Sequence, residues 1–137
     1  MEGENMIRVM NEEDLPVVKH IIQSIPYFWH ECWDDGTLNK ALKSSGSLSF
    51  VYEEDGCILG CIFAYDFGFR GYIAKIAVYE SARFKGIGKK LIKHVEDILR
   101  SNNCELIIAD ALESAVPFYK KLGWEEPNAI LLRKKLL

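Results

Sequence analysis

Two glycines near the middle of the chain, Gly86 and Gly88, stand where a strand-like run passes into a helix-like run. Amides in the first turn of a helix have no carbonyl partner, and with the helix dipole they attract anions. Glycine at this place lets a phosphate approach the backbone, because no side chain intervenes. Four cations surround the glycines: Arg83, Lys85, Lys89 and Lys90. Cations are unfavourable at the start of a helix, so this cluster predicts a bound anion.

The spacing of these glycines excludes two common phosphate-binding motifs. A P-loop ends in Gly-Lys-Ser or Gly-Lys-Thr, whereas Gly88 is followed by Lys89 and Lys90. A dinucleotide-binding loop needs a third glycine, and Leu91 stands at its position. The residues therefore indicate a phosphate ligand of another kind.

The run from Arg83 to Gly88 resembles the signature of the GNAT acetyltransferase superfamily, which is Arg or Gln, two residues, Gly, one residue, and Gly or Ala. A second family element, Ala followed four residues later by Tyr and then by Leu-Gly-aromatic, is matched from Ala115 to Trp124. The resemblance rests on specific motifs over residues 72–125, whereas before residue 72 it extends only to the order of helices and strands. The family often has Asn where this chain has Leu112, so one polar contact to the cofactor is in question.

The resemblance implies an acetyl-CoA-dependent N-acetyltransferase, in which a primary amine of a small molecule, a peptide or a protein attacks the thioester directly. Acetyl-CoA is then the co-substrate. The signature loop binds the pyrophosphate, and the strand before it pairs with the pantetheine arm. The backbone N–H of Val78 is expected to stabilise the oxyanion. The implied cofactor-binding residues are Ile76, Ala77, Val78, Arg83, Phe84, Lys85, Gly86, Ile87, Gly88 and Lys89.

Tyr119 occupies the place of the family tyrosine that protonates the leaving thiolate. A phenol with a pKa near 10 stays protonated at neutral pH and can act as this acid. The alternative is a core aromatic on an amphipathic helix. The general base stays open among Glu53, Glu54, Asp66, Glu80, His30 and a chain of water molecules.

The resemblance assigns the acceptor pocket to an aromatic segment, with Tyr27 and Phe28 as the substrate-binding residues and Trp29, His30 and Trp33 beside them. Rings next to acidic residues suit an amine with a cationic head. An equal alternative is that these rings fill the core beneath the sheet.

Hydrophobic periodicity and the order of the elements predict an α/β (α+β) fold with a mixed sheet. The resemblance implies that this central sheet is mostly antiparallel and is flanked by about four helices. Asp55-Gly56 predicts a hairpin turn between two strands. Asn11 is expected to cap the first helix. Helices are also expected over residues 37–43, 87–100 and 114–122, and strands over residues 6–10, 47–53, 57–65, 72–79, 106–109 and 130–137.

The composition fits a single globular domain over residues 1–137, with 49% apolar and 27% charged residues. The net charge of -3 argues against a general nucleic-acid binder. No apolar run is long enough for a membrane helix, and a cytoplasmic location is expected. The cysteine spacing predicts no metal site, and Cys57 and Cys61 are expected as buried residues on one face of a strand.

Two other functions stay open at this stage. One is a regulatory module that binds acyl-CoA as a sensor without turnover. The other is a nucleotide-binding domain unrelated to CoA. The assembly state is also open, with a homodimer as one candidate.

Overall fold

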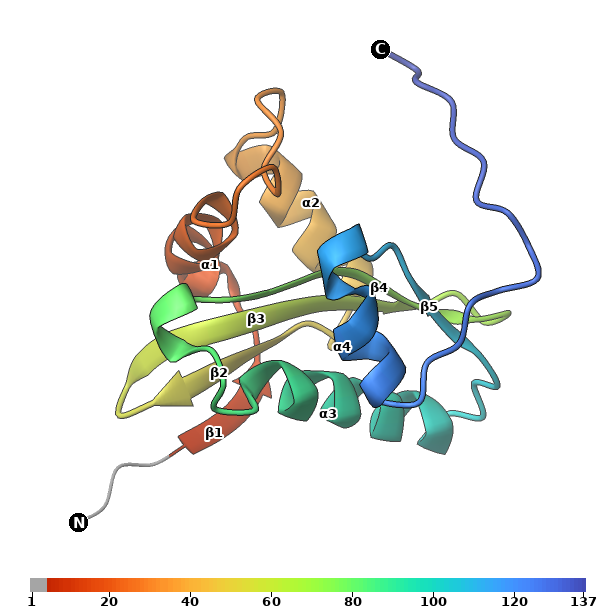
Figure 1. Cartoon of the computed structure of the whole chain (residues 1–137). Coiled ribbons are helices and arrows are strands. Elements are labelled where there is room, and N and C mark those ends of the chain that lie inside the picture. The colour runs from red at the N-terminus through yellow and green to blue at the C-terminus, as the bar shows by residue number, and fades with distance from the viewer. Residues whose placement is uncertain (1–4) are drawn as a thin grey trace.

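A five-stranded sheet forms the centre of the computed structural model, which describes residues 5–137 (Figure 1). Its strand order is β1-β2-β3-β4-β5. The first four strands pair antiparallel, and β5 is parallel to β4. The strands are β1 (Asn5–Val9), β2 (Phe50–Glu54), β3 (Cys57–Asp66), β4 (Gly71–Val78) and β5 (Ile107–Ala109). This arrangement confirms the expected mixed, mostly antiparallel sheet.

Helices cover both faces of this sheet (Figure 1). One face packs against α1 and α2 through a core that includes Ile21 and Phe63. The other face packs against α3 and α4 through a core that includes Ile73, Ile92 and Tyr119. The helices are α1 (Leu15–Gln23), α2 (Asp35–Ser45), α3 (Ile87–Ser101) and α4 (Val116–Lys121). None of the described helices has both the length and the apolar character needed to cross a membrane.

Local chain signals account for the start of α1 and for the hairpin between β2 and β3. Asn11 caps a short 3-10 turn that leads into α1, as expected, and Asp14 completes a capping box with it. Arg8 then joins this turn to the sheet, with ion pairs of 2.8 Å to Asp14 and 2.7 Å to Glu53. Asp55 and Gly56 form the hairpin turn with positive φ angles, which is the conformation that Asp-Gly favours.

A β-bulge in β3 overturns the expectation for the cysteines. Tyr52 pairs with Gly60 while Glu53 pairs with Ile58, so one extra residue stands in β3. An extra residue reverses which side chains face each side of the sheet. Cys61 is therefore fully buried, whereas Cys57 is exposed. The prediction that both are buried on one face was wrong.

The predicted last strand, residues 130–137, is absent: the segment makes no regular structure and runs away from the sheet (Figure 1). Its apolar side chains are exposed instead of buried. An apolar pattern shows that a segment favours burial, but a strand also needs a neighbouring strand edge, and that is a tertiary property. The exposed side chains are Ile130, Leu131, Leu132, Leu136 and Leu137.

Candidate active site

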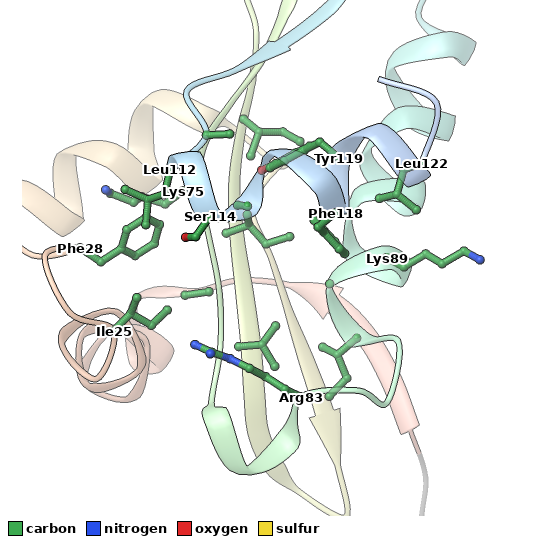
Figure 2. A pocket seen from close by; sticks show the side chains of 18 of the residues that line it. Ile25, Phe28, Lys75, Arg83, Lys89, Leu112, Ser114, Phe118, Tyr119 and Leu122 are labelled. Carbon is green, nitrogen blue, oxygen red and sulfur yellow. The ribbon is translucent and has the colours of Figure 1, made fainter. Parts of the chain in front are cut away.

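The site lies where β4 and β5 separate. The two strands pair only from Gly71–Ile107 to Ile73–Ala109, after which β4 continues to Val78 paired with β3 but no longer with β5. A cavity of about 1020 Å³ borders this free edge, and α3 and α4 contribute to its walls (Figure 2). The predicted pantetheine-binding residues Ile76, Ala77 and Val78 all line the cavity.

The loop before α3 presents a run of unpaired amides at one end of the cavity. Gly86 is the N-cap of α3 with φ +76°, and none of the side chains that the structure describes caps the helix. Within the described residues, none of the amides of residues 84–89 donates a hydrogen bond to another protein group. Free amides at a helix start, together with the helix dipole, form an arrangement that can bind an anion.

Backbone strain accompanies this loop. Phe84 has φ +67° although it is not glycine, and its side chain is fully exposed. Such a conformation costs about 1–3 kcal/mol and persists where the surrounding structure enforces it, often at ligand-binding loops.

The four cations around the loop take different positions. Arg83 and Lys89 are among the residues that line the cavity, although Figure 2 shows the Lys89 side chain extending outward. Lys85 Nζ lies 3.5 Å from Oε2 of Glu54, and the Lys85 side chain does not contribute to the cavity wall. Lys90 lies 5.8 Å from the centroid of Tyr52. Of the predicted cofactor-binding side chains, the structure thus brings all to the cavity except that of Lys85.

Tyr119 presents its hydroxyl to the cavity from α4 (Figure 2). The ring is buried between Phe118 and Trp124, at centroid distances of 5.4 and 4.9 Å. Burial raises the pKa of Tyr119 to about 12. The phenol is therefore protonated throughout the physiological range and can donate a proton into the cavity.

The aromatic segment after α1 divides between the cavity and a partly exposed cluster of rings beside it. Phe28 lines the cavity, and Tyr27 lies at its edge with 96% of its surface exposed and φ +65°. Trp29, His30 and Trp33 do not line it; Trp33 packs against both other rings. The two predicted substrate-binding residues thus lie at the cavity, whereas Trp29 packs against the core beside α1 and Trp33 contacts Trp29 and His30.

None of the five protein side chains considered as general base lines the cavity. Glu53 is paired with Arg8, and Asp66 accepts a hydrogen bond from the amide of Gly68. The carboxylates that do line the cavity are Asp110 and Glu113, which sequence reasoning missed. Asp110 directly follows β5, and the carboxyl ends of parallel strands are common sites for functional residues, so this signal was available.

Comparisons with known proteins agree with this geometry. The sequence profile of the Acetyltransferase (GNAT) family matches residues 14–124. An acetyltransferase of Pectobacterium atrosepticum is 25% identical, over 96% of this chain and 95% of its own length. The structure of Ard1 from Thermoplasma volcanium has a TM-score of 0.77 at 23% identity, covering 87% of this chain and 81% of its own. An aminoglycoside N-acetyltransferase in complex with CoA also has a TM-score of 0.77, at 20% identity, covering 100% of this chain and 98% of its own.

The matched region includes the loop with the unpaired amides, the separated strands and Tyr119. It spans most of the chain, so the resemblance noted from the loop and the second element is confirmed, as is the expectation of an enzyme. The chain belongs to the acetyltransferase (GNAT) family and is an N-acetyltransferase.

Proposed function

We propose that the chain transfers the acetyl group of acetyl-CoA to a primary amine by direct attack on the thioester. The observation that carries this proposal is the row of unpaired amides of residues 84–89 on the same cavity as the Tyr119 hydroxyl. These two features supply a place for a diphosphate and a proton donor for a thiolate. Four free cysteines fit a reducing, cytoplasmic setting, which is part of the proposal.

The free edge of β4 supports the pantetheine assignment. Tyr79 donates its amide to Leu59 O at 3.0 Å, on the β3 side. Residues along an antiparallel strand alternate the side to which they bond, so the N–H of Val78 points to the opposite edge, toward the cavity. This N–H can bond a cofactor amide or the thioester oxygen.

The proposed reaction needs a neutral amine. Its nitrogen forms a bond to the thioester carbonyl carbon, and the oxygen becomes an oxyanion that the Val78 N–H stabilises. The C–S bond then breaks, and Tyr119 gives its proton to the thiolate. The attacking amine also loses a proton during the reaction. The candidates to accept it are the carboxylates of Asp110 and Glu113, which line the cavity.

A thiol-release assay with acetyl-CoA and a panel of amines and peptides tests the proposal. Release that depends on an acceptor is the expected result. A folded protein that binds acetyl-CoA in calorimetry but releases no thiol with any acceptor would instead favour the sensor function. Folded protein that takes up neither CoA nor acetyl-CoA would contradict both.

A further inference from the structure

Phe28 lines one end of the cavity, and the chain's own Lys75 covers its ring and that of the neighbouring Trp33. The Nζ atom of Lys75 lies 3.9 Å from the ring centroid of Phe28 and 4.9 Å from that of Trp33. Lys75 and Phe28 both line the cavity (Figure 2). The sequence suggested that these rings receive a cationic acceptor, but an ammonium group of the protein already occupies their faces. A second cation there would be repelled.

A bulge in β4 accounts for this placement of Lys75. Phe63 pairs with Lys75, and the next residue, Ala64, pairs with Ile73, so Ala74 is an extra residue in β4. Bulges re-aim side chains and are common beside active sites. Lys75 is thereby directed toward the segment after α1, while Ile73 and Ile76 pack against the core beneath α3.

Lys75 has no carboxylate partner in the described part of the chain. Within residues 5–137, no Asp or Glu lies within ion-pair distance of its Nζ, although six other ion pairs are present. The nearest acidic influence is Asp110, whose Oδ2 already accepts a hydrogen bond of 2.7 Å from the Tyr72 hydroxyl. Burial lowers the pKa of Lys75, whereas the charge of Asp110 raises it, and the net effect is a lower pKa. The two aromatic faces stabilise this half-buried ammonium only in part, and an anion supplied by a ligand would complete its environment.

We infer that the acetyl acceptor is a small primary amine that also carries an anionic group, a carboxylate or a phosphate, and that Lys75 binds this group. The inference rests on the proposed function, because it concerns the acceptor of that reaction. Lysine acts as a point charge toward either kind of anion. The anion lies at the Phe28 end, and the amine faces the free edge of β4 and Tyr119.

Product analogues test this inference without turnover. The probes are N-acetyl-4-aminobutyrate and its neutral amide N-acetyl-4-aminobutanamide, with N-acetyl-O-phosphoethanolamine and N-acetylethanolamine as the phosphate pair. Each is titrated calorimetrically into CoA-saturated protein. A hydrogen bond to a charged group predicts about 10- to 100-fold tighter binding of an anionic probe than of its neutral partner. Comparison of the two pairs tells carboxylate from phosphate. Equal affinities in both pairs, or failure of both anionic probes to bind, would overturn the inference.

Variants of Lys75 separate anion binding from a packing role. Lys75→Met keeps an unbranched stem against Phe28 and Trp33, and we expect it to abolish the preference for the anionic probe without weakening the neutral one. Lys75→Arg should keep the preference, and Lys75→Glu should reverse it toward cationic N-acetylputrescine. Lys93→Met, at an exposed position of α3, is the matched control. If Lys75→Met weakens both probes of a pair equally, Lys75 only supports the rings, and the inference is wrong.

The same variants distinguish this inference from the proposed function. Acceptor-dependent thiol release without any preference for anionic amines would leave the transferase function standing and remove the acceptor class. A preference for anionic probes that depends on Lys75, without thiol release from any amine, would retain the anion site and contradict the transferase reaction.

Discussion

Gly88 in the first turn of α3 faces the ring of Phe118 on α4: a β-carbon at Gly88 would lie 3.2 Å from Cζ of Phe118 and 3.9 Å from Cδ1 of Ile76. All three residues line the cavity. A side chain at this position would therefore enter the space between the unpaired amides and α4. The second glycine of the loop is explained here by close approach, whereas Gly86 is explained by its positive φ angle.

Replacement of Gly88 by valine tests this contact. We expect Gly88→Val to weaken acetyl-CoA binding by at least about tenfold, because the branched side chain displaces Phe118 into the cavity and shields the amides. Calorimetric titration with acetyl-CoA measures the loss. Lys93→Val introduces the same side chain on the exposed side of α3 and should leave affinity unchanged. Unaltered affinity in Gly88→Val would show that the cofactor does not use this helix end.

Loss of the Tyr119 hydroxyl should affect turnover and spare binding. Tyr119→Phe keeps the ring packed against Phe118 and Trp124 but removes the proton donor, so kcat should fall by about 10²- to 10⁴-fold. The Kd for acetyl-CoA should change little. Tyr52→Phe removes a phenol from the buried core beneath α3 and is the control. An equal loss of turnover and of cofactor affinity would assign Tyr119 a structural role.

The pH profile of Tyr119 follows from its environment. Because burial raises its pKa to about 12, the hydroxyl should remain a proton donor across the whole range in which the amine becomes neutral. We expect kcat/KM to rise with pH as the acceptor amine deprotonates, with no falling limb caused by Tyr119 below about pH 11. A fall in kcat/KM near pH 9 that is present in the unaltered protein but missing from the residual activity of Tyr119→Phe would contradict this protonation state.

Acid should release the contact between Arg8 and Asp14. Burial raises the pKa of Asp14, but hydrogen bonds from Arg8 and from the amide of Asn11 outweigh it, and the net pKa lies below the ordinary value of 3.8. A carboxyl group whose pKa is lower in the folded than in the unfolded state stabilises the fold at pH values above its unfolded pKa. This stabilisation is lost as the pH falls through the folded pKa. Asp14→Asn should therefore cost about 1.5–3 kcal/mol at pH 7, and less below about pH 4.

Denaturant unfolding at pH 7 and below about pH 4 measures the effect of Asp14→Asn on the free energy of unfolding. The control is Asp97→Asn, which breaks an exposed ion pair with Arg100 and should cost about 0.5 kcal/mol or less. A difference between Asp14→Asn and the unaltered protein that does not depend on pH would show that the carboxylate charge is not what stabilises this turn.

The exposed segment 130–137 offers a test of its packing. Leu131→Ser with Leu132→Ser should change the free energy of unfolding by about 0.5 kcal/mol or less, because both side chains are exposed. Five exposed apolar side chains should instead promote self-association, which sedimentation velocity at several concentrations measures. A destabilisation of about 2 kcal/mol or more would show that the segment packs as the apolar pattern predicts.

Features that depend on neighbours along the chain could be predicted from the amino-acid sequence alone. Gly86 and Gly88 indicated the start of α3. This was possible because the unpaired amides at a helix start follow from the local backbone and not from contacts with distant segments. Asn11 and Asp55-Gly56 likewise marked a cap and a turn through their own backbone preferences.

Which side chains meet at the cavity depends on contacts between segments that are distant along the chain. The bulges in β3 and β4 arise from pairing between strands, so alternation along one strand could not reveal that Cys57 is exposed or that Lys75 reaches Phe28. The position of Asp110 follows from where β5 ends beside β4, which is a contact between segments far apart in the chain. Such contacts are set by packing and strand register, and a single sequence shows neither directly.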